Sequence, residues 1–350
     1  DNFMETKKTT IHDIANELGV TASTVSRALQ DHPRISDATK ENVMKMADKL
    51  NYQPNSIAAA LRKGKSNIIG VIIPMADRNF FASVIRGIEE IVNKSGYRVI
   101  ISQSNDSPDQ EKSNIKALLE LQVDGILASY AKKTTDFTHY EEIGNQGVPL
   151  ILFDRLHETL ESLGVGSVVI DDYLGAYKAT EHLIDQGCKR IAHFSGYQHV
   201  SIYKERRKGY EEALKRHDIP IDSKLIIESN LKLEAGRRLG KELLTWDRPP
   251  DAIFSASDYG AVGAMEILKK HHVAIPGDIA MVGFSNESFT SFLDPGLTTV
   301  DQHGEKMGQF AARLFLDQVE EDNDSQASSK TVLDPQLIVR KSSLKKKIIV

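Results

Sequence analysis

The residues of this chain with the most specific chemistry are Ala22, Ser23, Thr24, Ser26 and Arg27. They place small side chains, hydroxyls and one guanidinium along one side of a predicted helix. Small side chains let a helix lie close to base edges, hydroxyls hydrogen-bond to phosphates, and an arginine can donate two hydrogen bonds to a guanine. The pattern indicates non-covalent recognition of a nucleic-acid duplex, with Arg27 directed to guanine or to phosphate.

Two short helices joined by a tight turn must position these side chains. Gly19 supplies the turn, and Thr21 is placed to cap the second helix by accepting from the backbone N–H of Ser23 or Thr24. The inward faces carry apolar residues at helical spacing, namely Ile11, Ile14, Ala15 and Leu18, then Val25, Ala28 and Leu29. For a match of this length alone, a helical hairpin whose polar face only meets water is the alternative.

A third helix and a short alanine-rich segment follow. Residues 36–50 predict an amphipathic helix with an inward face of Val43, Met44, Ala47 and Leu50. Asn55 can cap a helix that runs through Leu61 and Arg62, but a helix of about two turns is marginal by itself. We expect it to fold only when two copies dock on DNA and insert their leucines between base steps. An alanine-rich linker helix is the alternative.

Three motifs resemble the lactose-repressor and galactose-repressor (LacI/GalR) family of bacterial transcription regulators. They are TTIHDIANELGVTASTVSRAL at residues 9–29, YQPN at residues 52–55, and a binding-protein-like body that reaches about residue 340. The resemblance implies base contacts from Ala22, Ser23 and Arg27, phosphate contacts from Thr10, Thr21, Thr24 and Ser26, and insertion of Leu61 into the minor groove. The family pattern has an arginine two residues before this leucine, where this chain has Ala59.

Composition agrees with a small head on a larger body. A chain of 350 residues suggests two or three domains, and its net charge of −5 divides unevenly. Residues 1–66 carry +2, which leaves −7 on the remainder, so the body should not adsorb to DNA indiscriminately. Cys188 is the one cysteine, so no disulfide can form within the chain, and the cytoplasm is the expected compartment. The sequence contains no apolar run long enough to predict a membrane span.

The body alternates β-rich runs with amphipathic helices, which predicts parallel sheets covered on both faces. Strands of one lobe are expected at residues 68–73, 98–102, 125–128 and 150–153, and strands of a second at 168–170, 190–194, 225–228, 252–254 and 279–284. Residues 297–300 and a helix at 305–319 are expected to return to the first lobe, and residues 331–333 and 337–340 to the second.

The expected fold is therefore a small all-α helix-turn-helix head joined by a hinge helix to an α/β, periplasmic-binding-protein-like body of two doubly wound parallel-sheet lobes. Its predicted parts are the head at 8–53, the hinge at 54–66, the first lobe at 67–166 plus 297–322, and the second lobe at 167–296 plus 323–343.

Polar and aromatic residues follow the predicted strands of both lobes. Doubly wound sheets bind ligands at the carboxyl ends of their strands, so this recurrence predicts an interlobe cleft. Taken singly, each residue could be a loop residue or a helix cap, and Asp258 in particular could cap the helix that follows it. The residues are Asn79, Phe80, Phe81, Asp106, Asp154, Arg155, Ser195, Asn230, Asp258, Ser285 and Asn286.

Arg206 is the strongest single candidate in the cleft. It lies on the apolar stripe of its predicted helix, four residues after Ile202 and three before Gly209. A guanidinium there needs a partner, either a ligand oxygen, which we favour, or a structural carboxylate. Phe80 and Phe81 are either core aromatics or a stacking surface for a sugar.

The resemblance implies that Phe80, Phe81, Asp154, Arg206, Asp258, Ser285 and Asn286 line an effector cleft. Purine-binding members of the family have arginine, threonine, phenylalanine and aspartate at the positions of Val200, Ile202, Leu231 and Ser285 here. A purine effector is therefore not expected. A neutral sugar or sugar derivative fits better, because carboxylates and amides satisfy hydroxyls while aromatic rings cover apolar sugar faces.

Catalytic motifs are missing from the sequence. Residues 164–166 lack the third glycine of a dinucleotide-binding loop, and no GxxxxGK[ST], GxSxG or HExxH occurs. We expect no enzyme and no cofactor. The expected function is a ligand-responsive, DNA-binding transcriptional regulator, acting as a homodimer on a palindromic operator. A solute-binding protein without DNA function is the alternative, but it would need export, and no signal-peptide pattern is evident.

Overall fold

The computed structural model describes residues 9–52, 65–320 and 329–345. The chain divides between Ser66 and Asn67 into two compact units. In the described part of the chain, none of the helices combines the length and the apolarity that a bilayer span requires.

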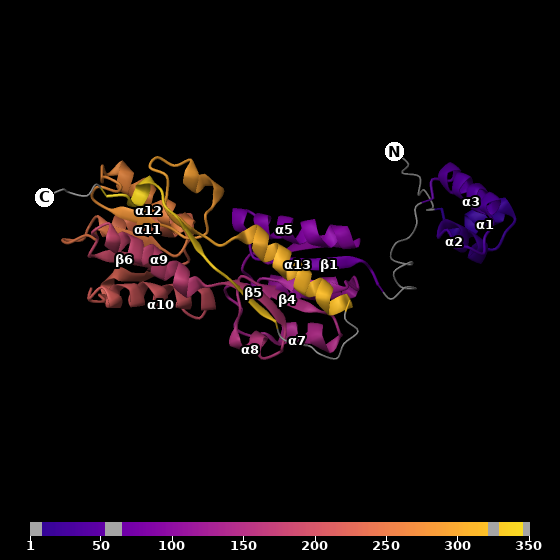
Figure 1. The fold of residues 1–350 in the computed structure, drawn as a ribbon, viewed down its shortest axis with the longest axis horizontal. Coiled ribbons are helices and arrows are strands. Elements are labelled where there is room, and N and C mark those ends of the chain that lie inside the picture. Colours follow the sequence, from indigo (N-terminus) through magenta and orange to yellow (C-terminus); the bar gives the residue numbers. More distant parts are fainter. Residues whose placement is uncertain (1–8, 53–64, 321–328, 346–350) are drawn as a thin grey trace, which may run out of the picture. The chain divides into compact units, whose positions relative to one another are not determined.

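The first unit is a helical bundle of α1 (Ile11–Leu18), α2 (Ala22–Leu29) and α3 (Asp37–Lys49) (Figure 1). Its core is the predicted one at Ile14, Val25 and Val43, which are fully buried. Met44 was predicted to point inward, and this is wrong, because its side chain is 59% exposed. It lies one residue after Val43 and so falls off the face that Val43 shares with Ala47, where Met46 packs instead.

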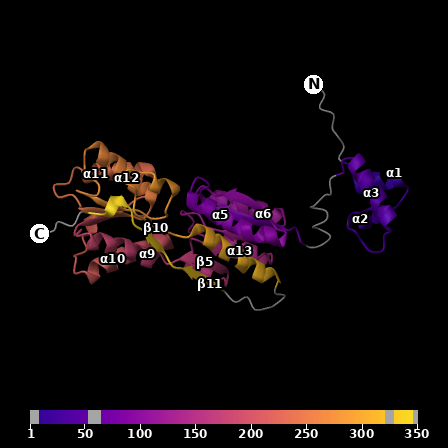
Figure 2. The same cartoon turned by 45° about the horizontal axis from the view of Figure 1, so that its top comes forward.

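The second unit contains two α/β lobes. The first lobe is built on a parallel sheet with the strand order β11-β5-β4-β3-β1-β2. Helices α5 and α13 lie side by side over one face, and α6 and α7 cover the other (Figures 1 and 2). The strands are β1 (Ile68–Ile73), β2 (Arg98–Gln103), β3 (Gly125–Ala128), β4 (Leu150–Phe153), β5 (Gly166–Ile170) and β11 (Lys330–Leu333). The helices are α5 (Asn79–Val92), α6 (Pro108–Glu120), α7 (Thr138–Asn145), α8 (Glu158–Glu161) and α13 (Gly304–Glu320).

The second lobe has a parallel sheet in the order β7-β6-β8-β9. Helices α9 and α10 pack on one face and α11 and α12 on the other, so alternate residues of β8 enter opposite cores. The strands are β6 (Ile191–Ser195), β7 (Ile226–Glu228), β8 (Ala252–Ser255) and β9 (Ala280–Val282). The helices are α9 (Asp172–Asp185), α10 (Ser201–Arg216), α11 (Leu233–Leu243) and α12 (Asp258–Lys270), and short 3₁₀ turns lie at Ser223–Leu225, Ser288–Ser291 and Lys341–Ser343. A further 3₁₀ turn, Asn93–Ser95, follows α5 in the first lobe.

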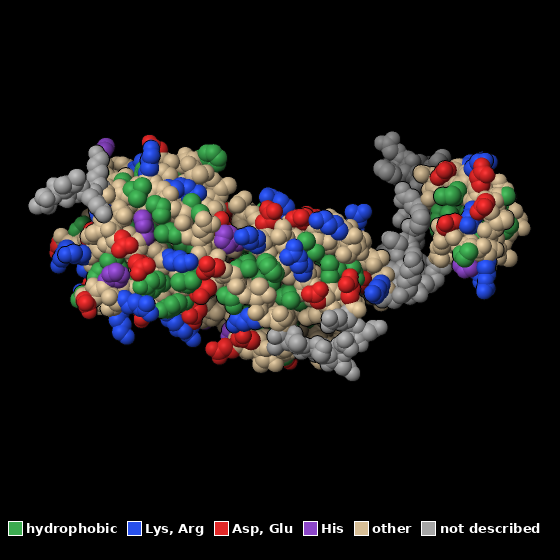
Figure 3. All heavy atoms as spheres, in the orientation of Figure 1, with side chains coloured by type: hydrophobic (Ala, Val, Ile, Leu, Met, Phe, Trp, Pro, Cys, Tyr) green, Lys and Arg blue, Asp and Glu red, His purple; other side chains and the backbone are tan. Residues whose placement is uncertain are grey.

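A two-stranded antiparallel ribbon of β10 (Thr299–Asp301) and β12 (Gln336–Ile338) accompanies the connections between the lobes. The chain passes from the first lobe to the second after β5, returns between β10 and α13, and crosses again between β11 and β12. Figure 3 shows acidic and basic side chains interspersed over one face of this unit.

Three strand placements predicted from the sequence are wrong. Residues 168–170 and 331–333 were assigned to the second lobe, but they form β5 and β11, which pair with each other at the edge of the first-lobe sheet. Residues 297–300 were assigned to the first lobe, but Leu297 and Val300 pack in the cores of the second. A short apolar strand has the same sequence pattern in either sheet, so hydrophobic periodicity could not identify the strands with which it pairs.

Candidate functional site

The first candidate site is the exposed face of α2. Gly19 adopts the left-handed conformation (φ 63°) and turns the chain between α1 and α2. As predicted, Thr21 caps α2, because its Oγ1 accepts from the Thr24 N–H at 3.2 Å. The buried contacts of Val25 and Ala28 then fix which face of α2 remains outside.

That outer face carries the predicted recognition residues. Ser23 and Arg27 are exposed, and Ala22, Thr24 and Ser26 are partly exposed. The Thr21 hydroxyl lies 2.8 Å from that of Ser23 and 2.9 Å from that of Thr24, so the start of the helix presents a cluster of hydroxyls. The arrangement offers hydroxyls and N–H groups at the helix start and a guanidinium one turn later.

Thr10 is exposed at the start of α1, and its hydroxyl donates to the Asp13 carboxylate at 2.7 Å. Its backbone N–H donates to the same carboxylate, which completes a capping arrangement. A phosphate contact from the Thr10 hydroxyl would therefore compete with Asp13. The predicted hinge helix, with the DNA-binding residues expected at Asn55, Leu61 and Arg62, lies outside the described residues.

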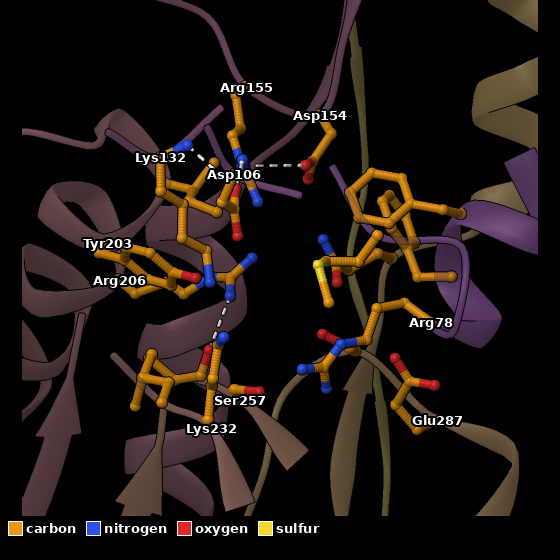
Figure 4. A pocket seen from close by; sticks show the side chains of 18 residues that line it. Arg78, Asp106, Lys132, Asp154, Arg155, Tyr203, Arg206, Lys232, Ser257 and Glu287 are labelled. Carbon is orange, nitrogen blue, oxygen red and sulfur yellow. Dashed lines mark hydrogen bonds and ion pairs between the residues drawn. The ribbon is translucent and has the colours of Figure 1, made fainter. Parts of the chain in front are cut away.

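The second candidate site is a cavity between the two lobes, lined by both (Figure 4). Its free volume is about 70 Å³, enough for a few water molecules. The carboxyl ends of strands from the two sheets meet here, as the strand-end rule predicted. Of the predicted ligand residues, those that line it are Phe80, Phe81, Asp154, Arg155, Arg206, Leu231 and Ser285.

Four predicted ligand residues do not line this cavity. Asn79 and Asn286 lie in a neighbouring hollow, where the Asn286 amide is held by Asp301 and Arg340. Val200 is fully buried in the core of the second lobe. Asp258 is also fully buried, and its carboxyl group accepts from the Thr299 hydroxyl and from the Glu287 N–H.

The Arg206 guanidinium has a structural carboxylate as its partner, which was the alternative to the ligand oxygen favoured from the sequence. Its Nε donates to Asp172 at 2.7 Å, and a terminal nitrogen donates to the Ala256 carbonyl at 2.8 Å. The guanidinium also lies 3.7 Å from the centre of the Phe284 ring. Arg206 is thus fixed at the cavity wall, and any ligand contact would come in addition to these bonds.

Arg155 organises the other wall. It donates to Asp106 at 2.8 Å and to the Tyr130 carbonyl at 2.6 Å, and its Nε lies 3.6 Å from Asp154. Burial opposes the charged form of Asp106, but Arg155 and Lys132 outweigh it and lower the pKa of this carboxyl. For Asp154 burial dominates and raises the pKa.

Backbone strain marks the same strand ends. Asp154 (φ 66°), Leu231 (φ 57°) and Ser285 (φ 118°) adopt positive φ, although none is glycine. Such conformations cost about 1–3 kcal/mol each and persist where the surrounding structure imposes them. Here they turn the chain just past a strand and direct these residues to the cavity.

Sequence reasoning missed several lining residues. Lys132 and Lys232 follow β3 and β7 by a few residues, and Gln302 directly follows β10, so a wider search past each strand end would have found them. Glu287, directly after the predicted Asn286, would have been found in the same way, whereas Tyr203 on helix α10 gave no such signal. Asp106, one of the predicted strand-end residues, also lines the cavity, whereas Ser195 and Asn230 of that set do not. The lining residues that were not predicted are Met75, Arg78, Lys132, Ile202, Tyr203, Lys232, Ala256, Ser257, Glu287 and Gln302.

Solved structures share this architecture. The chain is similar to a lac repressor dimer bound to operator and an anti-inducer, with a TM-score of 0.83, 25% identity, and coverage of 97% of this chain and 100% of that one. A complex of the transcriptional regulator CelR with cellobiose matches with a TM-score of 0.72 and 26% identity over 96% of this chain and 100% of that one. A regulator from Enterococcus faecium with bound ribose matches with a TM-score of 0.69 and 26% identity, over 80% and 100%.

Sequence comparisons agree with the geometry. Two family models match, "Bacterial regulatory proteins, lacI family" at residues 10–55 and "Periplasmic binding protein-like domain" at residues 180–343. The transcriptional regulator DegA of Bacillus subtilis is 33% identical over 96% of this chain and 98% of its own length. The transcriptional repressor CytR of Escherichia coli is 32% identical over 95% and 96%. These relatives are regulators of transcription rather than enzymes, and this chain belongs to the LacI family of bacterial regulatory proteins.

Proposed function

We propose that this regulator acts in the cytoplasm as a homodimer on a palindromic operator, and that a carbohydrate in the interlobe cavity controls its affinity for DNA. The observation that carries the proposal is the capped helix α2, which presents hydroxyls and Arg27 outward, in a chain that also has a polar interlobe cavity. Two copies of α2 would read the two half-sites of a symmetric operator.

Contacts between the lobes suggest how a ligand acts. The Asn79 N–H at the start of α5 donates to Glu287 of the second lobe at 2.9 Å, and His199 contacts the Lys132 carbonyl at 2.7 Å. Arg78 lies 3.5 Å from the centre of the Tyr259 ring. A ligand that favours or opposes these contacts changes the angle between the lobes. That angle would set the spacing of the two DNA-binding heads in a dimer.

The test is operator binding by Arg27→Ala. Fragments retained from chromosomal DNA provide the probe, and affinity is measured by gel retardation. Loss of one arginine contact to a base should weaken specific binding by about tenfold or more and relax the preference at one operator position. Affinity for unrelated DNA should fall much less.

Lys45→Ala is the matched control, because Lys45 is exposed on α3 and its ammonium pairs with Glu41 at 2.7 Å. It should leave the operator preference unchanged. Equal affinities of wild type and Arg27→Ala for every retained fragment would overturn the proposal. A chain that bound sugars but no DNA would favour a solute-binding protein without DNA function. The helix-turn-helix unit argues against that alternative, because a solute-binding protein does not need one.

A further inference from the structure

The interlobe cavity carries an excess of basic side chains. Its basic lining residues are Arg78, Lys132, Arg155, Arg206 and Lys232, and its acidic lining residues are Asp106, Asp154 and Glu287. A cavity built only for a neutral sugar needs no such excess. The partners of each charged group show where the excess lies.

The carboxylates are already engaged. Asp106 and Asp154 face Arg155 from one side, and Asp154 also accepts from the Ser129 hydroxyl at 3.1 Å. Glu287 accepts from the Asn79 N–H across the lobes. Arg206, in turn, is neutralised from behind by Asp172. Arg78 also lies 3.6 Å from the Asp77 carboxylate. The three arginines of the lining therefore have ion-pair partners within 4.0 Å, whereas Lys132 and Lys232 have none at that distance in the described part of the chain.

Two ammonium groups remain. Among the described residues, no carboxylate lies within 4.0 Å of the Nζ of Lys132 or of Lys232. Lys132 is half-buried, with its Nζ 5.3 Å from the centre of the Tyr203 ring. Lys232 is exposed at the start of α11, and Figure 4 shows its side chain and that of Arg206 directed to the same space.

Burial adds to the imbalance. It raises the pKa of Asp154 and the pKa of Glu287, and so disfavours their charged forms. A neutral ligand that filled the cavity would strip water from two ammonium groups and return no counter-charge. An anionic group would compensate them through charge-assisted hydrogen bonds.

We propose that the effector is an anionic sugar derivative, whose carboxylate or phosphate lies on the side of the cavity lined by Lys132, Lys232 and Arg206. This inference rests on the proposed function and narrows the sugar expected from the sequence to a charged one. The sugar ring would lie near Phe80 and Phe81, once the lobes separate enough to enlarge the cavity beyond its free volume of about 70 Å³.

The test is calorimetric titration of the full chain with matched pairs. Glucose is compared with glucuronate and glucose 6-phosphate, and galactose with galacturonate, with inorganic phosphate alone as a further probe. At least one acid or phosphate ester should bind about tenfold or more tightly than its neutral parent. Lys132→Met and Lys232→Met should each remove most of that difference, and added salt should reduce it.

Lys241→Met is the control. Lys232 occupies the N-cap position of α11, and Lys241 lies near the end of the same helix, where it is exposed and does not line the cavity. It should change none of the affinities. A neutral parent that binds as tightly as its acid would overturn the inference and leave the carbohydrate effector standing. Inorganic phosphate that binds as tightly as the sugar phosphate would indicate an ion site only. Binding of no sugar would overturn both, while the operator assay with Arg27→Ala would still test DNA recognition.

Discussion

At the scale of single residues, Asp258 shows that a position just after a strand does not by itself predict a ligand contact. It follows β8 by three residues, whereas Asp154 directly follows β4, and both were predicted to face the ligand. Asp154 lines the cavity, whereas Asp258 turns inward to the Thr299 hydroxyl and the Glu287 N–H. The difference depends on β10, whose position the sequence did not reveal. Residue type and position therefore predicted the edge of the sheet, but not the direction of each side chain.

The buried Asp258 carboxyl predicts a dependence of stability on pH. Burial raises its pKa from 3.8 to about 7 in the folded chain. The folded state therefore keeps this proton where the unfolded chain has lost it. The stabilisation is complete below about pH 4 and is lost as the pH rises through about 7. Wild type should become less stable between pH 5 and pH 8 by up to about 1.4 kcal/mol per pH unit from this group.

Asp258→Asn should remove that part of the pH dependence, because the amide does not titrate. Urea unfolding at both pH values measures it, and the free energy of unfolding should fall less in the variant than in wild type. Asp247→Asn, at an exposed position, should keep the wild-type slope. An identical slope in all three proteins would show that Asp258 does not hold its proton in the folded state.

At the scale of elements, the packing of α5 against α13 depends on glycine. A Cβ built on Gly308 would overlap the carbonyl oxygen of Val84, and one on Gly87 would overlap that of Glu305. Gly308→Ala should therefore force the helices apart and destabilise the chain by about 1–3 kcal/mol.

Gly144→Ala is a matched control in helix α7, where an added Cβ meets no atom within 4 Å. It should be neutral or stabilising by up to about 1 kcal/mol, because alanine restricts the unfolded chain. Thermal unfolding of both variants distinguishes the cases. If Gly308→Ala were as stable as Gly144→Ala, the close approach of α5 and α13 would be wrong.

The elements themselves were largely predictable, and their partners were not. The helices of the first unit follow from caps at Thr21 and Ser36 and from apolar spacing, which are local signals. The alternation of strands and helices in the second unit is also local. Whether β5 and β11 join the first or the second sheet depends on pairing between residues about 160 positions apart, such as Lys330 with Ser167, and periodicity carries no such information.

At the scale of the whole molecule, the contact between Asn79 and Glu287 links the lobes. Glu287 belongs to the second lobe but accepts from the first N–H of α5, a helix whose preceding residue, Arg78, provides no side-chain cap. Glu287→Ala should therefore loosen the first turn of α5 in the other lobe, and hydrogen exchange of the segment 77–84 should become faster.

Glu305→Ala provides the comparison. Glu305 of α13 pairs with Arg86, farther along α5, at 3.5 Å, and its removal should leave exchange at the start of α5 unchanged. Unaltered exchange in Glu287→Ala would mean that this contact does not hold the lobes together. A ligand that closes the cavity should slow exchange in wild type, which connects the cavity to the angle between the lobes.

The most direct test of the central claim, that α2 reads a DNA sequence, is sequencing of the chromosomal fragments that the purified chain retains. Wild type should enrich fragments that share a two-fold symmetric sequence, and Arg27→Ala should lose that enrichment or shift it at one position of each half-site. Retention of the same fragments by wild type and Arg27→Ala, with no shared symmetric sequence, would contradict the account.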